Sequence, residues 1–350
     1  MAEQGESGHG FIILQWNCRS INSNFSQLYN YISNHSADIL VIQSVKRKRS
    51  LLPSIDGFDF PPIVEQKGPG QLIQTVIYLK SSLNYKPFAP LIPSSENLST
   101  CAVEIEIKGS KNLNIVNIYY PHGCNKKGTT DWLKSLDHSR AHWCVMGDFN
   151  NHHPLWDSAN PRYKHANSNL ADVILETDFC ILNDGSATRL PDRADHSPSA
   201  IDLSLCSNAI VTDIDWNVFP DTLGSDHLPI VLTFRHFAPN RNNSETRKKY
   251  NYKQANWDSF RAELEGVREE TLLTDDIEAS YNNIRQCILT AANNHIPLKS
   301  VNPNCKAKRN EWWNADYDEA LANKRYHIRT YLRHCSDANF TNMKSAEITI

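Results

Sequence analysis

Short apolar segments recur between Phe11 and Phe234, and the spacing of their hydrophobic residues predicts strands that alternate with helices. An apolar run from Phe11 ends at Asn17, and a helical pattern follows over residues 25–32. A second apolar run covers residues 38–43. This order predicts that the chain opens with a strand, a helix and a strand.

The middle of the chain continues the pattern with shorter segments. Residues 101–107 alternate apolar and polar side chains, which predicts a strand with one face toward water. Further strands are predicted at residues 72–79, 113–120, 143–146, 179–182, 200–206, 210–218 and 228–234, and helices at 131–136 and 168–176. We therefore expect an α/β fold in which two mixed β-sheets pack together between flanking helices, as a four-layer α/β sandwich.

The pattern changes after Phe237. Residues 238–245 are polar and lack periodicity, which is typical of a linker, whereas the hydrophobic spacing beyond them is helical. Helices are predicted at residues 257–273, 276–292 and 312–335. We expect a disordered start at 1–10, a main domain at 11–236, a linker at 237–255 and a smaller all-α segment at 256–350.

Composition narrows the class of protein. A net charge of −3 gives no global sign of polyanion binding, so any contact with nucleic acid must be local. The nine cysteines include no CxxC pair, which favours reduced thiols in an intracellular protein. The first ten residues lack the apolar segment of a secretion signal, and no apolar run approaches the roughly 20 residues of a membrane span. We expect no membrane partner.

Polar side chains lie at the ends of several of the predicted strands. They are Asn17, Tyr119, Asp148, Asn150, Asp202, Asp226 and His227. Because the carboxyl ends of neighbouring strands converge in space, such a set suits metal-assisted hydrolysis of a phosphodiester bond. Taken singly, each has a plainer explanation, since Gly147-Asp148 could be an ordinary turn after a strand.

Five stretches occur in an order and spacing that carry a family resemblance: Trp16-Asn17, Tyr119-x-Pro121, Gly147-Asp148-Phe149-Asn150, Ile201-Asp202-Leu203 and Ser225-Asp226-His227. They resemble the exonuclease/endonuclease/phosphatase superfamily, and most of all the apurinic-type endonuclease domain of LINE-type (jockey-like) non-LTR retrotransposons. The run from Asn150 to Trp156 and the Thr188-Arg189 loop resemble that retrotransposon branch. The similarity covers residues 11–234.

The resemblance implies a Mg²⁺- or Mn²⁺-dependent DNA endonuclease and a role for each matching residue. Asp148 would orient or deprotonate the attacking water, and Asn150 would contact the phosphate beside it. His227 would stabilise the transition state while Asp202 holds its tautomer. Tyr119 would donate to the phosphate. Asn17 and Asp226 would lie around the metal.

One position departs from the family pattern. Where the family has a Gln-Glu pair whose glutamate is the main metal ligand, this chain has Gln43 and Ser44. Serine offers a neutral hydroxyl on a shorter stem, so the site loses a negative charge and a direct ligand. The alternative reading is therefore a catalytically inactive, repurposed or truncated nucleic-acid-binding remnant of the same fold.

The expected partner is DNA, bound by Arg189 and by the basic run Lys46, Arg47, Lys48 and Arg49. As structure alone, such a run is more often a solvated loop. Residues 255–260 and 311–314 resemble the segment that joins endonuclease and reverse transcriptase in such elements. No polymerase motif is present, so element RNA or a reverse transcriptase domain absent from this chain is a further expected partner. Nuclear localisation is implied by the family. Action on RNA or on a phosphorylated lipid or sugar fits less well.

Overall fold

The computed structural model describes residues 10–60, 72–90, 92, 98–121, 127–158, 169–241, 250–274, 276–298 and 314–348. The chain divides into two compact units. One comprises Met1–Arg241 together with Ala307–Ile350, and the other comprises Asn242–Lys306. The predicted disordered start at residues 1–10 lies outside the described residues, apart from Gly10.

The first sheet has six strands in the order β11-β12-β1-β2-β4-β3. Its strands are β1 (Phe11–Asn17), β2 (Ile39–Arg47), β3 (Phe58–Asp59), β4 (Ile73–Lys80), β11 (Ile214–Val218) and β12 (Ile230–Phe234). β1 runs parallel to β2, whereas the other neighbours are antiparallel. The strand that closes the predicted domain, β12, therefore lies beside the strand that opens it.

The second sheet also has six strands, in the order β5-β6-β7-β8-β10-β9. Its strands are β5 (Tyr85–Phe88), β6 (Ser99–Ile105), β7 (Leu113–Tyr119), β8 (His142–Asp148), β9 (Phe179–Ile181) and β10 (Asp202–Ser207). Only β7 and β8 are parallel among its paired strands. Both sheets are thus mixed, as the sequence predicts.

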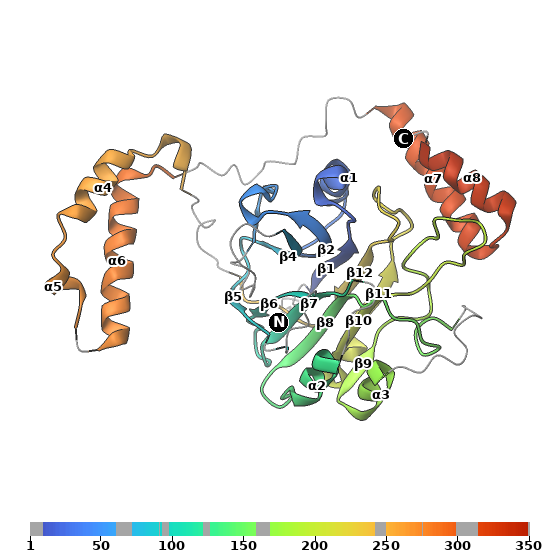
Figure 1. The fold of residues 1–350 in the computed structure, drawn as a ribbon, viewed down its shortest axis with the longest axis horizontal. Helices are drawn as coiled ribbons and strands as arrows, with labels where there is room; N and C mark the ends of the chain where they lie inside the picture. Colours follow the sequence, from blue (N-terminus) through green and yellow to red (C-terminus); the bar gives the residue numbers. More distant parts are fainter. Residues whose placement is uncertain are drawn as a thin grey trace, which may run out of the picture. The chain divides into compact units, whose positions relative to one another are not determined.

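Three apolar layers hold the sandwich together. The central layer joins side chains of both sheets, such as Ile13 and Val41 from the first and Ile115 and Cys144 from the second. Helix α1 (Ile21–Asn34) packs on the outer face of the first sheet. Helices α2 (Lys127–Ser135) and α3 (Asn169–Glu176) cover the outer face of the second (Figure 1). The predicted four-layer α/β sandwich is confirmed.

Some predicted elements differ from the observed ones. Residues Asn208–Asp213 form a 3-10 helix, so the strand predicted from residue 210 begins only at Ile214. The helix predicted over 257–273 is two helices, α4 (Trp257–Glu265) and α5 (Glu269–Leu272), because Gly266 caps the first. Helix α7 (Ala315–Arg333) matches the third predicted helix in part. The Trp312-Trp313 pair lies outside the described residues.

The start of the predicted linker belongs to the first unit and bonds to the residues that follow β6. Phe237 is buried in the central apolar layer. The backbone of Ala238 accepts a hydrogen bond from Lys108 at 2.9 Å, and the amide of Asn240 donates to Glu106 at 2.8 Å. The structure also adds a helix that the sequence pattern does not predict, α8 (Asp337–Ile348). The division at 237–255 remains a prediction.

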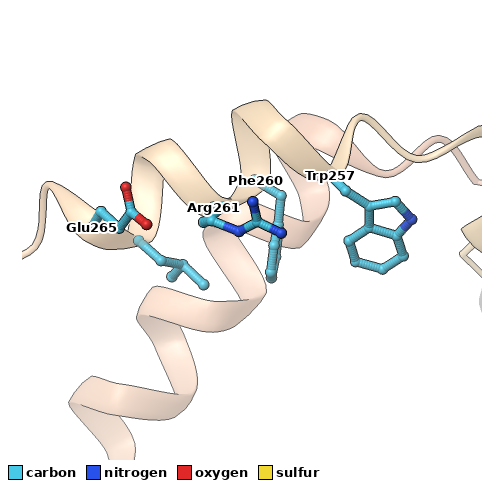
Figure 2. A pocket seen from close by; sticks show the side chains of 5 residues that line it. Trp257, Phe260, Arg261 and Glu265 are labelled. Carbon is cyan, nitrogen blue, oxygen red and sulfur yellow. The ribbon is translucent and has the colours of Figure 1, made fainter.

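The unit at Asn242–Lys306 contains α4, α5 and α6 (Ile277–His295). Helix α4 packs on α6, and Asn294 donates to the carboxylate of Glu263 at 3.1 Å. Trp257, Phe260, Arg261, Leu264 and Glu265 line a pocket of about 440 Å³ along α4 (Figure 2). Among the described helices of the whole chain, none is long and apolar enough to cross a membrane.

Candidate active site

Strand ends from both sheets meet at one edge of the sandwich. Asn17 is the last residue of β1 in the first sheet, and Asp148 is the last residue of β8 in the second. Asp202, which opens β10, lies directly opposite Asp148 in the antiparallel pairing. Tyr119 lies opposite Asp148 on the other side, in the parallel pairing of β7 with β8.

Glycine at position 147 is required by the close approach of β7 to β8. Its φ is 155°, and a Cβ atom there would lie 1.8 Å from the carbonyl oxygen of Ile118. Any larger residue would push the two strands apart. Asp148 would then move away from the other strand ends, so Gly147 helps to place the carboxylate.

Asp148 is buried and held by two asparagines. The side chain of Asn17 donates to its Oδ2 at 2.8 Å, and the backbone N–H of Asn150 donates to its Oδ1 at 2.9 Å. Asn150 also donates its side-chain amide to the carbonyl of Tyr120 at 2.6 Å. Burial, together with the nearby charge of Asp202, raises the pKa of Asp148 to about 7. A carboxylate with such a pKa can accept a proton near neutral pH.

His227 is the second buried titratable group of the site. Its Nδ1 lies 2.7 Å from Oδ2 of Asp202, which fixes the orientation of the ring. Burial alone would lower the pKa of His227, but the carboxylate of Asp202 outweighs it and raises the pKa to about 9. The imidazolium is therefore the form present at neutral pH, and its other N–H is available to an anionic group.

Thr188 supports this pair from the opposite side. Its hydroxyl donates to Oδ2 of Asp202 at 2.7 Å and accepts from the backbone N–H groups of Ile201 and Asp202 at 3.2 and 3.1 Å. Sequence reasoning noted Thr188 only as part of a loop resembling the retrotransposon branch. Nothing in a single sequence indicates that it touches Asp202, which lies 14 residues further on.

The pairing of His227 with Asp202 predicts a measurable titration. In metal-free protein, Asp202→Asn should lower the pKa of His227 from about 9, because the carboxylate that raises it most is removed while the effect of burial remains. NMR of the imidazole ring as a function of pH measures this directly. The exposed carboxylate of Asp172 on α3 provides the control, Asp172→Asn, which should leave the titration unchanged.

The same pair predicts the sign of a stability change. Since the folded-state pKa of His227 lies above its ordinary value, its stabilising contribution is complete below pH 6.5 and is lost as the pH rises through about 9. An unaltered His227 titration in Asp202→Asn would show that Asp202 does not control the charge of the histidine.

Asp226 lies beside His227, but its carboxylate forms ion pairs with two arginines. Arg189 Nε is 3.1 Å from its Oδ2, and Arg19 is 3.5 Å from its Oδ1. Burial would raise the pKa of Asp226, but the positive charges of His227, Arg189 and Arg19 lower it. Arg19 was not among the residues predicted from the sequence. The backbone N–H of Arg19 donates to Oδ1 of Asn17 at 3.0 Å, so Arg19 lies next to the site.

Ser44, at the position of the family's glutamate, lies at the same edge as Asn17. Asn17 pairs with Gln43 between β1 and β2, and the pairing of β2 with β4 shifts register between Gln43 and Arg47. Ser44 is buried and has a φ of 55°. A bulge of this kind redirects side chains and is frequent next to active sites. Ser44 thus lies in an irregular stretch of β2 beside the end of β1, and its side chain is short and neutral.

The predicted basic run follows this bulge. Lys46, Lys48 and Arg49 are exposed and Arg47 is half-buried. Lys46 also has a left-handed backbone conformation, with a φ of 54°. These positive charges extend from the edge of the first sheet that carries Ser44.

The donor set fits a divalent cation. Ligand atoms of Asp148, Asp202 and His227 lie within 4.8 Å of one another. Oδ1 of Asp202 is buried and has no hydrogen-bond partner among the described residues. Carboxylate oxygens suit Mg²⁺ or Mn²⁺, whereas the charged ring of His227 does not. Of the residues predicted around the metal, Asn17 touches this cluster, Asp226 is paired with arginines, and Ser44 brings no charge.

The sequence is similar to proteins of mobile elements. A family model described as "Endonuclease-reverse transcriptase" matches residues 113–231. Two Drosophila melanogaster proteins are similar over most of the chain. One, a probable RNA-directed DNA polymerase from transposon X-element, is 25% identical over 284 residues, which are 78% of this chain. The other, from transposon BS, is 26% identical over 294 residues, or 80% of this chain. The matched region spans 30% of each of these relatives.

Solved structures share the fold. The endonuclease domain of TRAS1, a telomere-specific non-LTR retrotransposon, superposes with a TM-score of 0.52 at 19% identity, covering 65% of this chain and 99% of that domain. The AP endonuclease LMAP from Leishmania major gives a TM-score of 0.52 at 15% identity, covering 66% of this chain and 89% of that enzyme. At such identities the structural likeness establishes the fold.

Proposed function

We propose that residues 11–234, which have the fold of the endonuclease/exonuclease/phosphatase proteins, are an endonuclease domain of the non-LTR retrotransposon type. In this proposal the chain hydrolyses a phosphodiester bond of DNA with the help of Mg²⁺ or Mn²⁺. One observation carries the proposal. Asp148, with a raised pKa, and the Asp202–His227 pair lie buried together where strands of both sheets end. A buried carboxyl group whose pKa is raised to about 7, close to a buried and charged histidine, is typical of functional sites.

In the proposed reaction, Asp148 takes the proton of a water molecule that attacks the phosphorus. Asn17 and Asn150 hold its two oxygens, so the carboxylate keeps one orientation. As the new P–O bond forms and the bond to the departing oxygen breaks, negative charge grows on the phosphate. The imidazolium of His227 lies where it can stabilise that charge, and Tyr119 donates to the same group.

A bound divalent cation would supply further positive charge to the phosphate oxygens. The carboxylates of Asp148 and Asp202, with Asn17 beside them, are the residues that would hold it. The two arginines on Asp226 contribute fixed positive charge at the mouth of the site. In this proposal Arg189 would meet a phosphate of the DNA backbone.

The basic run after β2 supports DNA as the substrate. Neutralising Lys46, Arg47, Lys48 and Arg49 should weaken DNA binding without changing sequence choice, and should reduce the slope of log K against log salt by about 0.9 for each residue that contacts a phosphate. Fluorescence anisotropy with a labelled duplex over a series of salt concentrations measures both quantities.

A matched control removes four exposed positive charges from the other end of the second sheet and its edge: Lys86, Lys108, Lys111 and Arg140. Removing these four charges should leave the slope of log K against log salt unchanged if DNA binds at residues 46–49. An unchanged slope in the variant of residues 46–49 would instead mean that this run is a solvated loop.

Nicking of supercoiled plasmid tests the function as a whole. The native chain should convert supercoiled to open circular DNA in the presence of Mg²⁺ or Mn²⁺, and a chelator should stop the reaction. A native chain that binds duplex DNA but does not nick it with either ion would favour the alternative function. In that case Ser44 marks a non-catalytic, nucleic-acid-binding domain of the same fold.

The relatives suggest wider partners. Both Drosophila relatives are described as RNA-directed DNA polymerases, and this chain spans 30% of their length. We infer that element RNA or a polymerase domain is a partner of the chain, and that the chain acts on chromosomal DNA in the nucleus. Localisation of the tagged chain in cells tests the nuclear part of this proposal.

A further inference from the structure

A buried charge cluster joins helix α7 to the loop that follows β11. Asp221 is fully buried, and each of its oxygens has a cationic partner from α7. Lys324 Nζ lies 3.0 Å from Oδ1, and Arg325 Nε lies 2.9 Å from Oδ2. The guanidinium of Arg325 also lies over the ring of Phe219, 5.3 Å from its centroid.

The burial of Lys324 separates this cluster from an ordinary surface ion pair. Lysine is almost never fully buried unless it is paired, and here its side chain is 4% exposed. Moving an ammonium and a carboxylate out of water is unfavourable, so the arrangement persists only while the partners hold good geometry. The contact therefore fixes α7 to the loop in one position.

Apolar packing extends this contact beneath the active-site loops. Ile328 and Tyr331 of α7 and Met343 of α8 pack with Leu190 and Leu228. Leu190 follows Arg189 in the chain, and Leu228 follows His227. The two loops also bond to each other, since the N–H of Leu228 donates to Thr188 at 2.7 Å and that of Leu190 donates to Asp226 at 2.8 Å.

A tight turn connects Asp221 to His227. The carboxylate of Asp221 accepts from the N–H of Leu223 at 3.2 Å. Leu223 has a φ of 51°, a conformation that a bulky residue adopts only when its surroundings enforce it. Further along, the hydroxyl of Ser225 donates to the carbonyl of Asn17 at 2.8 Å and accepts from the N–H of His227 at 3.2 Å. Through these hydrogen bonds, the position of Asp221 helps to determine the position of His227.

We propose that α7 and α8 are an integral part of the nuclease unit, and that Lys324 and Arg325 are positioning residues that act through Asp221 on the turn carrying Asp226 and His227. The catalytic meaning of this positioning rests on the function proposed above, whereas the positioning itself does not. A segment that resembles a connector in sequence thereby sets the geometry of the active-site histidine.

Hydrogen exchange of the full chain tests the proposal without requiring activity. Lys324→Met keeps the length of the side chain but leaves Asp221 short of one partner. Mass spectrometry should show at least tenfold faster exchange of the amides of Leu190, Ser225 and Leu228, with no change in β1 or β8. Arg333→Met, an exposed charge on the same helix, is the control and should change none of them.

A second variant covers the case in which Lys324→Met unfolds. The double variant Asp221→Asn with Lys324→Met removes both fully buried charges and leaves only the partly exposed guanidinium of Arg325. It should therefore fold and exchange more slowly at these amides than Lys324→Met alone. Native exchange in the 223–228 turn of a folded Lys324→Met variant would overturn the proposal, as would a double variant no better protected than the single one.

An activity arm separates this proposal from the proposed function. If the native chain nicks plasmid, Lys324→Met should lower kcat by a larger factor than it raises KM, because the basic run at residues 46–49 is untouched and only Arg189 lies in the loosened loops. The native chain could fail to nick while the Lys324→Met variant still shows faster exchange. That result would remove the catalytic function but leave the positioning role in place.

Discussion

Asp148→Ala is expected to reduce plasmid nicking by about 10²- to 10⁴-fold, the range that a positioned proton acceptor contributes to a reaction. Asp148 is the residue of the site whose pKa, at about 7, best suits proton transfer at neutral pH. The loss should appear in kcat, since Asp148 is proposed to touch the attacking water and not the DNA backbone. Steady-state nicking of a labelled duplex separates kcat from KM.

Stability provides the control for this variant. Burial raises the pKa of Asp148, so the folded state bears an unfavourable carboxylate at pH values above about 7. Asp148→Asn should therefore unfold at the same or a higher temperature than the native chain at pH 8, although it is inactive. The exposed Asp172→Asn should keep full activity. Undiminished nicking by Asp148→Ala would exclude Asp148 from the mechanism and point to a contaminating nuclease.

Ser44→Glu is expected to tighten the apparent Mg²⁺ affinity by about 10- to 100-fold, by analogy with the effect of altering groups around a metal site. Ser44 follows Gln43, which pairs with Asn17 at the end of β1, so the carboxylate of glutamate would lie close to the proposed metal site. Serine already adopts the left-handed φ of 55° at position 44, and glutamate would be strained there to a similar extent. The substitution should therefore add little backbone strain. Nicking rates over a series of Mg²⁺ concentrations measure the change.

Ser44→Gln is the matched control, because it has the length of glutamate without its charge. If the two variants behave alike, the charge at position 44 does not reach the metal. Nicking by Ser44→Glu alone, with none by the native chain, would show an intact scaffold whose metal site is disabled. The alternative function, nucleic-acid binding without catalysis, would then describe the native protein.

The architecture was predictable because it depends on regular patterns. Two-residue alternation and apolar runs mark strands, and strand ends in such a fold converge. Asn17, Asp148 and Asp202 could therefore be expected at one edge of the sandwich, where the structure does place them. Their chemical roles, and those of His227 and Tyr119, remain predictions that the variants above test.

The partners of these residues could not be predicted, because they depend on how distant segments pack. Arg325 meets Asp221 across 104 residues of sequence. Lys324 occupies a helical pattern in which a charge ordinarily faces water, and only the docked helix buries it. Arg19 reaches Asp226 because a left-handed backbone at φ 55° follows β1, and no spacing rule indicates such a bend. Helix α8 was missed because its side chains form no apolar stripe.

The pairing of β12 with β1 determines when the protein can first act. Asn17 lies near the beginning of the chain and His227 directly before β12, so the ribosome must complete almost the whole domain before the two can meet. At a translation rate of about 5 to 20 residues per second, the growing chain lacks an assembled site for roughly tens of seconds. A product of premature termination before β12 would lack the histidine or its supporting strand. The topology thus couples assembly of the proposed active site to completed translation of the domain.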